Sequence, residues 1–229
     1  MPNLVPQHLA IIMDGNRRFA KEQGKPSYEG HLAGHETLKN VGDWCLEAGV
    51  KYLTVFGFST ENWKRSGDEV EFLMKLFYRA VTEELETFNK KGIRLRILGR
   101  REGLSLELAE AFDKAEKSTA GNTNANLSLA INYGGRIEIL DAVKKILTEG
   151  VSAEKITEEL FASKLTTNGM PDPDLILRTS GEKRLSGFLT WQSVYSELIF
   201  IDKHWPALTR EDFNAILEEF ANRQRRFGK

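Results

Sequence analysis

The sequence predicts an α/β fold: a single domain, residues 1–229, with a mostly parallel sheet of about six strands flanked by helices. The first observation behind this is a set of short apolar runs with the length of buried strands. These runs cover residues 9–13, 52–58, 93–98, 127–132, 174–178 and 198–201. The second is that helical patterns separate most of the runs, as in parallel sheets whose faces are covered by helices. The third is a length that fits one domain, with no internal repeat or linker.

Four helices follow from apolar stripes at helical spacing, at residues 28–47, 68–90, 105–120 and 210–223. The first carries Cys45 within its stripe, so we expect this lone cysteine in the core and not as a nucleophile. It also places His31 and His35 four residues apart on one face, a spacing that suits phosphate or metal contacts as well as simple exposure. Helix 68–90 is apolar on more than one face. It is either a core helix held between two neighbours or a helix that lines an elongated apolar cavity.

Composition argues against several classes of function. The formal net charge is −1, so no overall field attracts nucleic acid or an anionic membrane, and an RNA-binding module is not favoured. One cysteine excludes an intramolecular disulfide, and no P-loop or dinucleotide fingerprint is present. There is also no signal peptide and no apolar run of membrane-spanning length. We therefore expect a cytoplasmic protein, with any membrane contact peripheral and at the inner face of the membrane.

Polar residues that suit phosphate groups follow three of the predicted strands. Asp14 ends the first apolar run, and Gly-Asn-Arg-Arg follows it at the expected start of a helix. Arginine side chains and helix N-terminal amides bind phosphate oxygens, and Mg²⁺ typically takes one or two carboxylates together with phosphate oxygens. The same letters also fit a common turn with two solvated arginines, so this stretch alone leaves the function open.

The second strand ends in GFSTENWKR, and the fifth ends at Arg178. Because the carboxyl ends of parallel strands meet at one edge of a sheet, we expect these loops to lie beside Asp14. Arg184 and Ser186 are spaced to surround a second phosphate group with Arg178, and Glu197 is a candidate second carboxylate for the metal. Each charge-assisted hydrogen bond contributes about 1.5–3 kcal/mol. Five or six of them could hold two diphosphates at about micromolar affinity.

With these loops in view, the chain resembles the cis-prenyltransferases, the undecaprenyl diphosphate synthase family, over residues 8–228. The motifs that carry the resemblance are HLAIIMDGNRRFAK, GFSTENWKR, NYGGR, DPDLILRTSGEKRLSGFLTWQ followed by YSE, and the final RRFG. The resemblance implies a transferase that adds isopentenyl diphosphate repeatedly to an allylic diphosphate, usually farnesyl diphosphate. The product would be a polyprenyl diphosphate such as undecaprenyl diphosphate, a lipid carrier precursor. It also implies Mg²⁺, an elongated apolar tunnel, and a homodimer in which Arg226-Phe227-Gly228 reaches toward the neighbouring site.

The resemblance also assigns roles to matching positions. Asp14 and Glu197 would bind Mg²⁺, and Asp14 would help the allylic diphosphate to leave. Asn62 is the family's candidate for aiding proton removal; because an amide is a poor base, a relay to the departing diphosphate is the alternative. The allylic diphosphate would be held by Gly15, Asn16, Arg17, Arg18 and His31. Isopentenyl diphosphate would be held by Arg178, Arg184 and Ser186. The reacting atoms would be flanked by Ser59, Asn62, Trp63 and Arg65. Phe19, Thr60, Glu61 and Leu185, in the same motifs, complete the expected substrate-binding set.

Three positions depart from the family pattern. Arg17 stands where many bacterial members have Gly, Ser27 where a basic residue is usual, and Gly187 where Asn or Asp is usual. These differences bear on affinity more than on the type of reaction. Gly57, small and near the expected tunnel mouth, favours long products. A non-catalytic subunit that supports a partner is the alternative function, but such relatives usually lose the aspartate or the arginines that this chain keeps.

Overall fold

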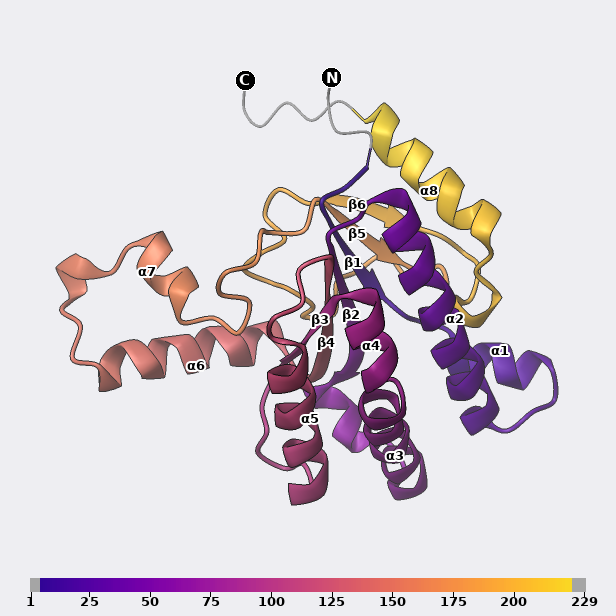
Figure 1. Cartoon of the computed structure of the whole chain (residues 1–229), viewed down its shortest axis with the longest axis horizontal. Coiled ribbons are helices and arrows are strands. Elements are labelled where there is room, and N and C mark those ends of the chain that lie inside the picture. Colours follow the sequence, from indigo (N-terminus) through magenta and orange to yellow (C-terminus); the bar gives the residue numbers. More distant parts are fainter. Residues whose placement is uncertain (1–4, 224–229) are drawn as a thin grey trace.

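One six-stranded parallel sheet forms the centre of the computed structural model, which describes residues 5–223 (Figure 1). The strands lie in the order β3-β4-β2-β1-β5-β6, and every neighbouring pair is parallel. Their bounds are β1 His8–Ile12, β2 Tyr52–Ser59, β3 Ile93–Leu98, β4 Ala125–Tyr133, β5 Leu175–Arg178 and β6 Glu197–Phe200. The predicted α/β fold class and the six predicted strands are thus confirmed, with ends that shift by one or two residues.

Helices connect the strands and account for the four predicted stripes. The α-helices are α1 Asn16–Glu22, α2 Ser27–Ala48, α3 Gly67–Glu83, α4 Leu85–Lys91, α5 Leu106–Thr119, α6 Gly135–Thr148, α7 Glu158–Ser163 and α8 Arg210–Asn222. Short 3₁₀ turns are η1 Thr60–Lys64, η2 Ala153–Lys155 and η3 Trp205–Ala207. Caps explain several of these ends: Ser105 accepts a hydrogen bond from the amide of Leu108, Thr209 caps α8, and Gly49 ends α2 in a left-handed conformation.

The single helix predicted over residues 68–90 is wrong, because the structure divides it into α3 and α4 at Glu84. The backbone of Glu84 has φ −97° and ψ 0°, outside the helical range. The break redirects the chain so that Leu85 and Phe88 of α4 still pack on the main core. No glycine or proline marks this position, so the apolar stripe reads as continuous in the sequence.

The two faces of the sheet are covered differently. On one face, side chains of every strand pack against α2, α3, α5 and α8 in the main hydrophobic core, which includes Phe112, Phe213 and Trp205. On the other face, a smaller cluster packs Ala10 and Ile12 of β1 against Phe188 and neighbouring loop residues. Helices α6 and α7 extend away from the sheet in Figure 1. The alternation of residues along β1 between the two clusters is what a strand buried on both faces requires.

The central strand β1 marks the point where the order of strands reverses. From β1 the chain first builds one side of the sheet through β2, β3 and β4, then returns to the other side with β5 and β6. Open α/β sheets bind ligands outside the carboxyl ends of the strands at such a switch point. The loops after β1 and β5 are therefore the place to look for a site.

The model gives no sign of a membrane-spanning segment: among residues 5–223, no helix combines the length and the apolar character that such a span needs.

His8, a buried residue at the start of β1, makes hydrogen bonds to β2 and to the loop before β5. Its Nδ1 lies 2.7 Å from the carbonyl oxygen of Pro171, and its Nε2 lies 2.8 Å from Oγ1 of Thr54 on β2. Burial lowers the pKa of His8 from its ordinary value of 6.5 to about 4, against the opposing influences of the Pro171 carbonyl and Asp174. The folded state therefore favours the neutral imidazole.

We expect folding stability to fall as pH drops below about 6.5. In that range the unfolded chain binds a proton at His8, whereas the folded chain, with its lower His8 pKa, does not. The contribution is present above the unfolded pKa and is lost progressively as pH falls toward 4, up to about 3 kcal/mol. Urea unfolding at pH 7.5 and pH 4.5 measures the difference for wild type and for His8→Gln. If both proteins show the same pH dependence, His8 is not the titrating group.

Candidate active site

Asp14 is fixed by backbone contacts at the carboxyl end of β1. Its amide donates to Oγ1 of Thr179 at 3.0 Å, and the Thr179 hydroxyl donates to the Asp14 carbonyl oxygen at 2.7 Å. The amide of Trp205 also donates to that carbonyl at 3.0 Å. These hydrogen bonds join the loops after β1 and β5 to the turn η3, and Asp14 lies where the three segments meet.

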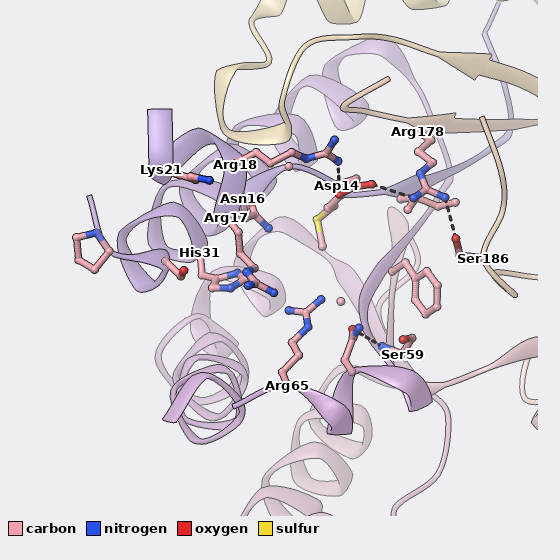
Figure 2. Close-up of a pocket in the computed structure, with 18 of the residues that line it drawn as sticks. Asp14, Asn16, Arg17, Arg18, Lys21, His31, Ser59, Arg65, Arg178 and Ser186 are labelled. Atoms are coloured by element: carbon pink, nitrogen blue, oxygen red, sulfur yellow. Dashed lines mark hydrogen bonds and ion pairs between the residues drawn. The ribbon is translucent and has the colours of Figure 1, made fainter. Parts of the chain in front are cut away.

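The carboxylate of Asp14 is clasped by two arginines (Figure 2). Arg178, at the end of β5, approaches Oδ2 at 2.8 Å, and Arg18, on α1, approaches Oδ1 at 3.0 Å. Burial alone would raise the pKa of Asp14, but the hydrogen bonds and positive charges of Arg178 and Arg18 outweigh it, and the pKa lies below its ordinary value. Asp14 is thus ionised at neutral pH and ready to hold a cation.

Arg178 links the loop after β5 to Asp14 from a buried position, with 5% of the residue exposed. It donates to Oγ of Ser186 at 2.9 Å and to the carbonyl oxygen of Arg184. Within the part of the chain that the structure describes, its Nε is buried without a hydrogen-bond partner. The predicted meeting of the Asp14 and Arg178 loops on one edge of the sheet is confirmed.

These groups line an open cavity of about 670 Å³ at the carboxyl edge of the sheet. The cavity is strongly cationic although the whole chain carries a net charge of −1. Its charged lining comprises one carboxylate, Asp14, and six cationic side chains, Arg17, Arg18, Lys21, Lys25, Arg65 and Arg178. Such an imbalance favours a ligand with several negative charges.

Glu69, at the start of α3, organises three of the basic groups behind this cavity. Its carboxylate lies 2.9 Å from Arg65, 3.2 Å from Nε2 of His31 and 3.7 Å from Arg17. Burial is the main reason that the pKa of His31 is lowered, and the neighbouring arginines reinforce it against the pull of Glu69. Arg17, Arg65 and His31 come from three different segments, and one partly buried carboxylate holds them together.

Many of the predicted site residues line the cavity. They are Asp14, Gly15, Asn16, Arg17, Arg18, His31, Ser59, Asn62, Arg65, Arg178 and Ser186. Others do not: Phe19, Thr60, Glu61, Trp63, Arg184, Leu185 and Glu197 are not part of its lining. Trp63 instead donates from its indole to Oδ1 of Asn132 at 2.8 Å, and Leu185 packs on the smaller core cluster. Arg184 is largely exposed and pairs with Glu182. Their predicted contacts with substrate therefore stay predictions.

Within one chain, the structure does not bring Glu197 together with Asp14, the other predicted metal ligand. Glu197 begins β6, and the parallel register pairs it with Leu175, the first residue of β5, while Arg178 pairs with Phe200. It therefore lies at the amino edge of the sheet, roughly 10 Å along the strand from the edge that carries Asp14. There its carboxylate binds Arg223 at 2.9 Å.

Asn62 has a local structural contact. Its Oδ1 accepts a hydrogen bond from the amide of Ser59 at 3.0 Å, as part of a reciprocal cap at the start of η1. The only basic atom of the side chain is thus engaged by the backbone. The cap fixes the polar loop after β2 against the cavity.

Sequence reasoning missed two lysines and one glutamate. Lys21 lies three residues after Arg18 on α1, so helical spacing could have placed it on the same side. Lys21 and Lys25 line the cavity beside Ser27, and they supply positive charge near the position where the family usually has a basic residue. Glu69 gave no local signal, because its partners are distant in the sequence.

Two apolar cavities continue from the cationic one between the sheet and helices α2, α3 and α4. The upper one, about 70 Å³, shares Met13, Asn16, His31 and Gly57 with the cationic cavity. The lower one, about 200 Å³, shares His35, Leu38, Ala80 and Leu129 with the upper one. The three spaces form a series that starts at the charged edge of the sheet and ends beside α4.

The donors around Asp14 fit a magnesium ion that arrives with a phosphate ligand. Among residues 5–223, no cluster of three or more His, Cys, Asp or Glu side chains could hold a metal ion alone. Mg²⁺ commonly uses one or two carboxylates and takes its other ligands from phosphate and water. An ionised Asp14 within a ring of arginines meets that description.

Comparison with known proteins agrees with this geometry. The family model described as putative undecaprenyl diphosphate synthase matches residues 12–228. The chain belongs to this family. It is 52% identical to an isoprenyl transferase of Thermotoga maritima, over 98% of this chain and 97% of the relative. It is 44% identical to a ditrans,polycis-undecaprenyl-diphosphate synthase of Legionella pneumophila described as (2E,6E)-farnesyl-diphosphate specific, over 100% and 98% of the two chains. The chain is accordingly a prenyltransferase.

Solved structures extend the comparison to the fold. Lavandulyl diphosphate synthase from Lavandula x intermedia, in complex with dimethylallyl diphosphate, has a TM-score of 0.94 and 33% sequence identity, over 99% of both chains. A probable undecaprenyl diphosphate synthase from Campylobacter jejuni has a TM-score of 0.82 and 37% identity, over 98% of this chain and 99% of the other. The whole described domain therefore has the prenyltransferase fold.

Gly15 provides a test of how closely the prenyltransferase site is packed. Its φ is +103°, and a Cβ there would lie 2.7 Å from both Nδ1 of His204 and Oγ of Ser180. We expect Gly15→Ala to lower the free energy of unfolding by about 1–3 kcal/mol and to weaken binding of inorganic pyrophosphate. Gly24→Ala is the matched control, since Gly24 also has positive φ but a Cβ there meets nothing within 4 Å. Equal effects in urea unfolding and calorimetry would contradict the packing argument.

Proposed function

We propose that this prenyltransferase is a Mg²⁺-dependent cis-prenyltransferase that condenses isopentenyl diphosphate repeatedly onto an allylic diphosphate, with farnesyl diphosphate as the starter. The observation that carries the proposal is a row of three adjoining cavities: the cationic one around Asp14 shares lining residues with the upper apolar one, which shares others with the lower. Diphosphates need the first environment, and a growing hydrocarbon chain needs the second.

The chemistry begins with departure of the allylic diphosphate. Bound Mg²⁺ would supply positive charge to the leaving group, and Asp14 is the carboxylate that would hold it. Arg18 and Arg178 lie 3.0 and 2.8 Å from the Asp14 carboxylate, and each can turn its remaining donors to phosphate oxygens. Such preorganised donors stabilise charge that develops during the reaction.

Two diphosphates fit on opposite sides of Asp14. The α1 side offers Asn16, Arg17 and Arg18, with His31 from α2, for the allylic diphosphate. The β5 side offers Arg178 and Ser186, which already contact each other at 2.9 Å, for isopentenyl diphosphate, with Arg184 next to them on the same loop. This division places both reacting chains above the apolar cavities.

Proton removal then falls to the departing diphosphate. Asn62 is engaged through its Oδ1 with the Ser59 amide, so its role is to position the loop and to orient its remaining amide hydrogens. Diphosphate oxygens are stronger bases than a neutral amide oxygen. Arg65 and Ser59 line the same side of the cavity and can hold the second substrate in place during the transfer.

The product is a long-chain polyprenyl diphosphate such as undecaprenyl diphosphate, a lipid carrier precursor. Gly57 supports this, because it lies between the cationic and upper apolar cavities and leaves the opening free. A Cβ at this position would lie 3.4 Å from Phe77 and so would narrow the entrance. The enzyme acts without nucleic acid, in the cytoplasm, and contacts the inner face of the membrane through its product.

The active unit is a homodimer. Helix α6 presents Leu140, Val143 and Leu147 to solvent, and the loop before β6 presents Val194 and Tyr195. These exposed apolar side chains lie on parts of the chain outside the main core and suit burial against a second copy. The predicted reach of Arg226-Phe227-Gly228 to the neighbouring site falls outside the described residues.

Asp14→Asn is expected to lower kcat by two or more orders of magnitude, because the side chain loses its charge toward Mg²⁺ while its shape is kept. The measurement is incorporation of radiolabelled isopentenyl diphosphate with farnesyl diphosphate and Mg²⁺, with EDTA abolishing it. Asp141→Asn is the control, since Asp141 also pairs with an arginine, Arg100, and has a pKa lowered by that pairing. A wild-type protein that folds but incorporates nothing would refute the proposed activity.

Leu147→Glu is expected to shift the protein from dimer to monomer, because a charge would be buried in the proposed interface. Leu106→Glu on α5 is the control, since Leu106 is 75% exposed and Leu147 69% exposed. Sedimentation velocity separates the two forms. A wild-type monomer at micromolar concentration would overturn the assignment of this surface.

A further inference from the structure

Helix α2 follows the whole series of cavities. His31 lines the cationic and upper apolar cavities, His35 lines both apolar cavities, and Leu46 lines the lower one. At 1.5 Å per residue, the distance from His31 to Leu46 along the helix is about 22 Å. His35 therefore stands where the two apolar cavities adjoin, on the path proposed for the growing chain.

His35 differs from the apolar side chains around this passage. Its Nε2 lies 3.2 Å from Oε1 of Glu84, and the two side chains are only 19% and 20% exposed. Lys39, one turn further along α2, approaches the same carboxylate at 3.6 Å. A hydrogen bond from His35 chiefly lowers the pKa of Glu84, and Lys39 adds to this, so Glu84 is ionised at neutral pH.

Glu84 lies one helical turn after Ala80, which lines both apolar cavities, so the spacing of α3 places it on the same side. Glu83, the last residue of α3, pairs with Arg79 on the exposed side of the helix. Glu84, one residue later and outside the helical range, lines the lower cavity and reaches α2. One half-buried polar pair thus joins α2 to the end of α3 beside the place where the two apolar cavities adjoin.

We propose that His35, held by Glu84, is a specificity-determining residue that narrows the passage between the two apolar cavities and so limits the length of the polyprenyl product. This inference rests on the proposed function and adds to it the residue that sets its product length. His35 acts on the chain after each condensation and takes no part in the transfer itself.

The physical reason is that a hydrocarbon cannot replace the hydrogen bond between His35 and Glu84. An isoprenoid chain offers no hydrogen bond to the imidazole or to the carboxylate. If the ring moved aside to let the chain pass, Glu84 would lose its partner in a half-buried position, which is unfavourable. The pair therefore resists displacement, whereas an apolar side chain could change rotamer at little cost. His35 belongs to the lining of both the upper cavity, about 70 Å³, and the lower one, about 200 Å³.

The test compares product lengths of two variants that change the size of the obstacle in opposite directions. His35→Ala joins the two cavities, and we expect its products to be longer than those of wild type by at least one isoprene unit. His35→Phe enlarges the ring, and we expect shorter products. Both should retain kcat for the first condensation within about twofold of wild type, because the cationic cavity is untouched. Mass spectrometry of the products at equal total turnover gives the lengths.

Glu84→Ala and Glu83→Ala form the matched pair for the role of the carboxylate. We expect Glu84→Ala to release His35 and shift the products toward longer chains, and Glu83→Ala to leave them unchanged. Circular dichroism and the urea midpoint establish that each variant is folded. Unchanged products in both His35 variants, with wild-type elongation intact, would overturn this inference alone. Absence of isopentenyl incorporation by the wild type would instead refute the proposed function.

Discussion

The ion pair between Asp14 and Arg178 is the contact on which the active site depends. It joins the ends of β1 and β5, two neighbouring strands that are far apart in the sequence, at an N–O distance of 2.8 Å. Arg178 is buried, so its charge is tolerable only because Asp14, Ser186 and a carbonyl oxygen surround it. The pair keeps the carboxylate ionised and in place before any ligand arrives. The phosphate donors on both sides are positioned relative to it.

The distribution of charge explains how a chain with no net excess of positive charge can bind diphosphates. Six basic side chains converge on one edge of the sheet, and Glu69 draws three basic groups together without lining that cavity itself. Next to this cationic cavity, along helix α2, the cavities are lined mainly by apolar side chains. This sharp boundary separates the part of the substrate that ionises from the part that must stay dry.

The sequence allowed much of this arrangement to be predicted because the site follows the ends of strands. Asp14 and Arg178 were placed together by the rule that parallel strands end on one edge, and the structure agrees. The same rule, applied to Glu197, would have excluded it, since that residue begins its strand and so lies on the other edge. The break at Glu84 and the grouping around Glu69 depend on contacts between distant segments, and no local pattern reports such contacts. The tight packing of His204 and Ser180 against Gly15 likewise has no signature along the chain.

Helix α3 is fastened to α2 near both of its ends, by Glu69 to His31 and, just past its last residue, by Glu84 to His35. Because contacts near both ends hold α3 to α2, α3 cannot move outward without breaking one of them. The space between the two helices therefore keeps a nearly constant width. Room for a longer tail must then come from trimming the side chains that face inward, among them Leu73, Leu76 and Phe77. Substitutions at these positions can change the volume of the apolar cavities during evolution and leave the site around Asp14 unaltered.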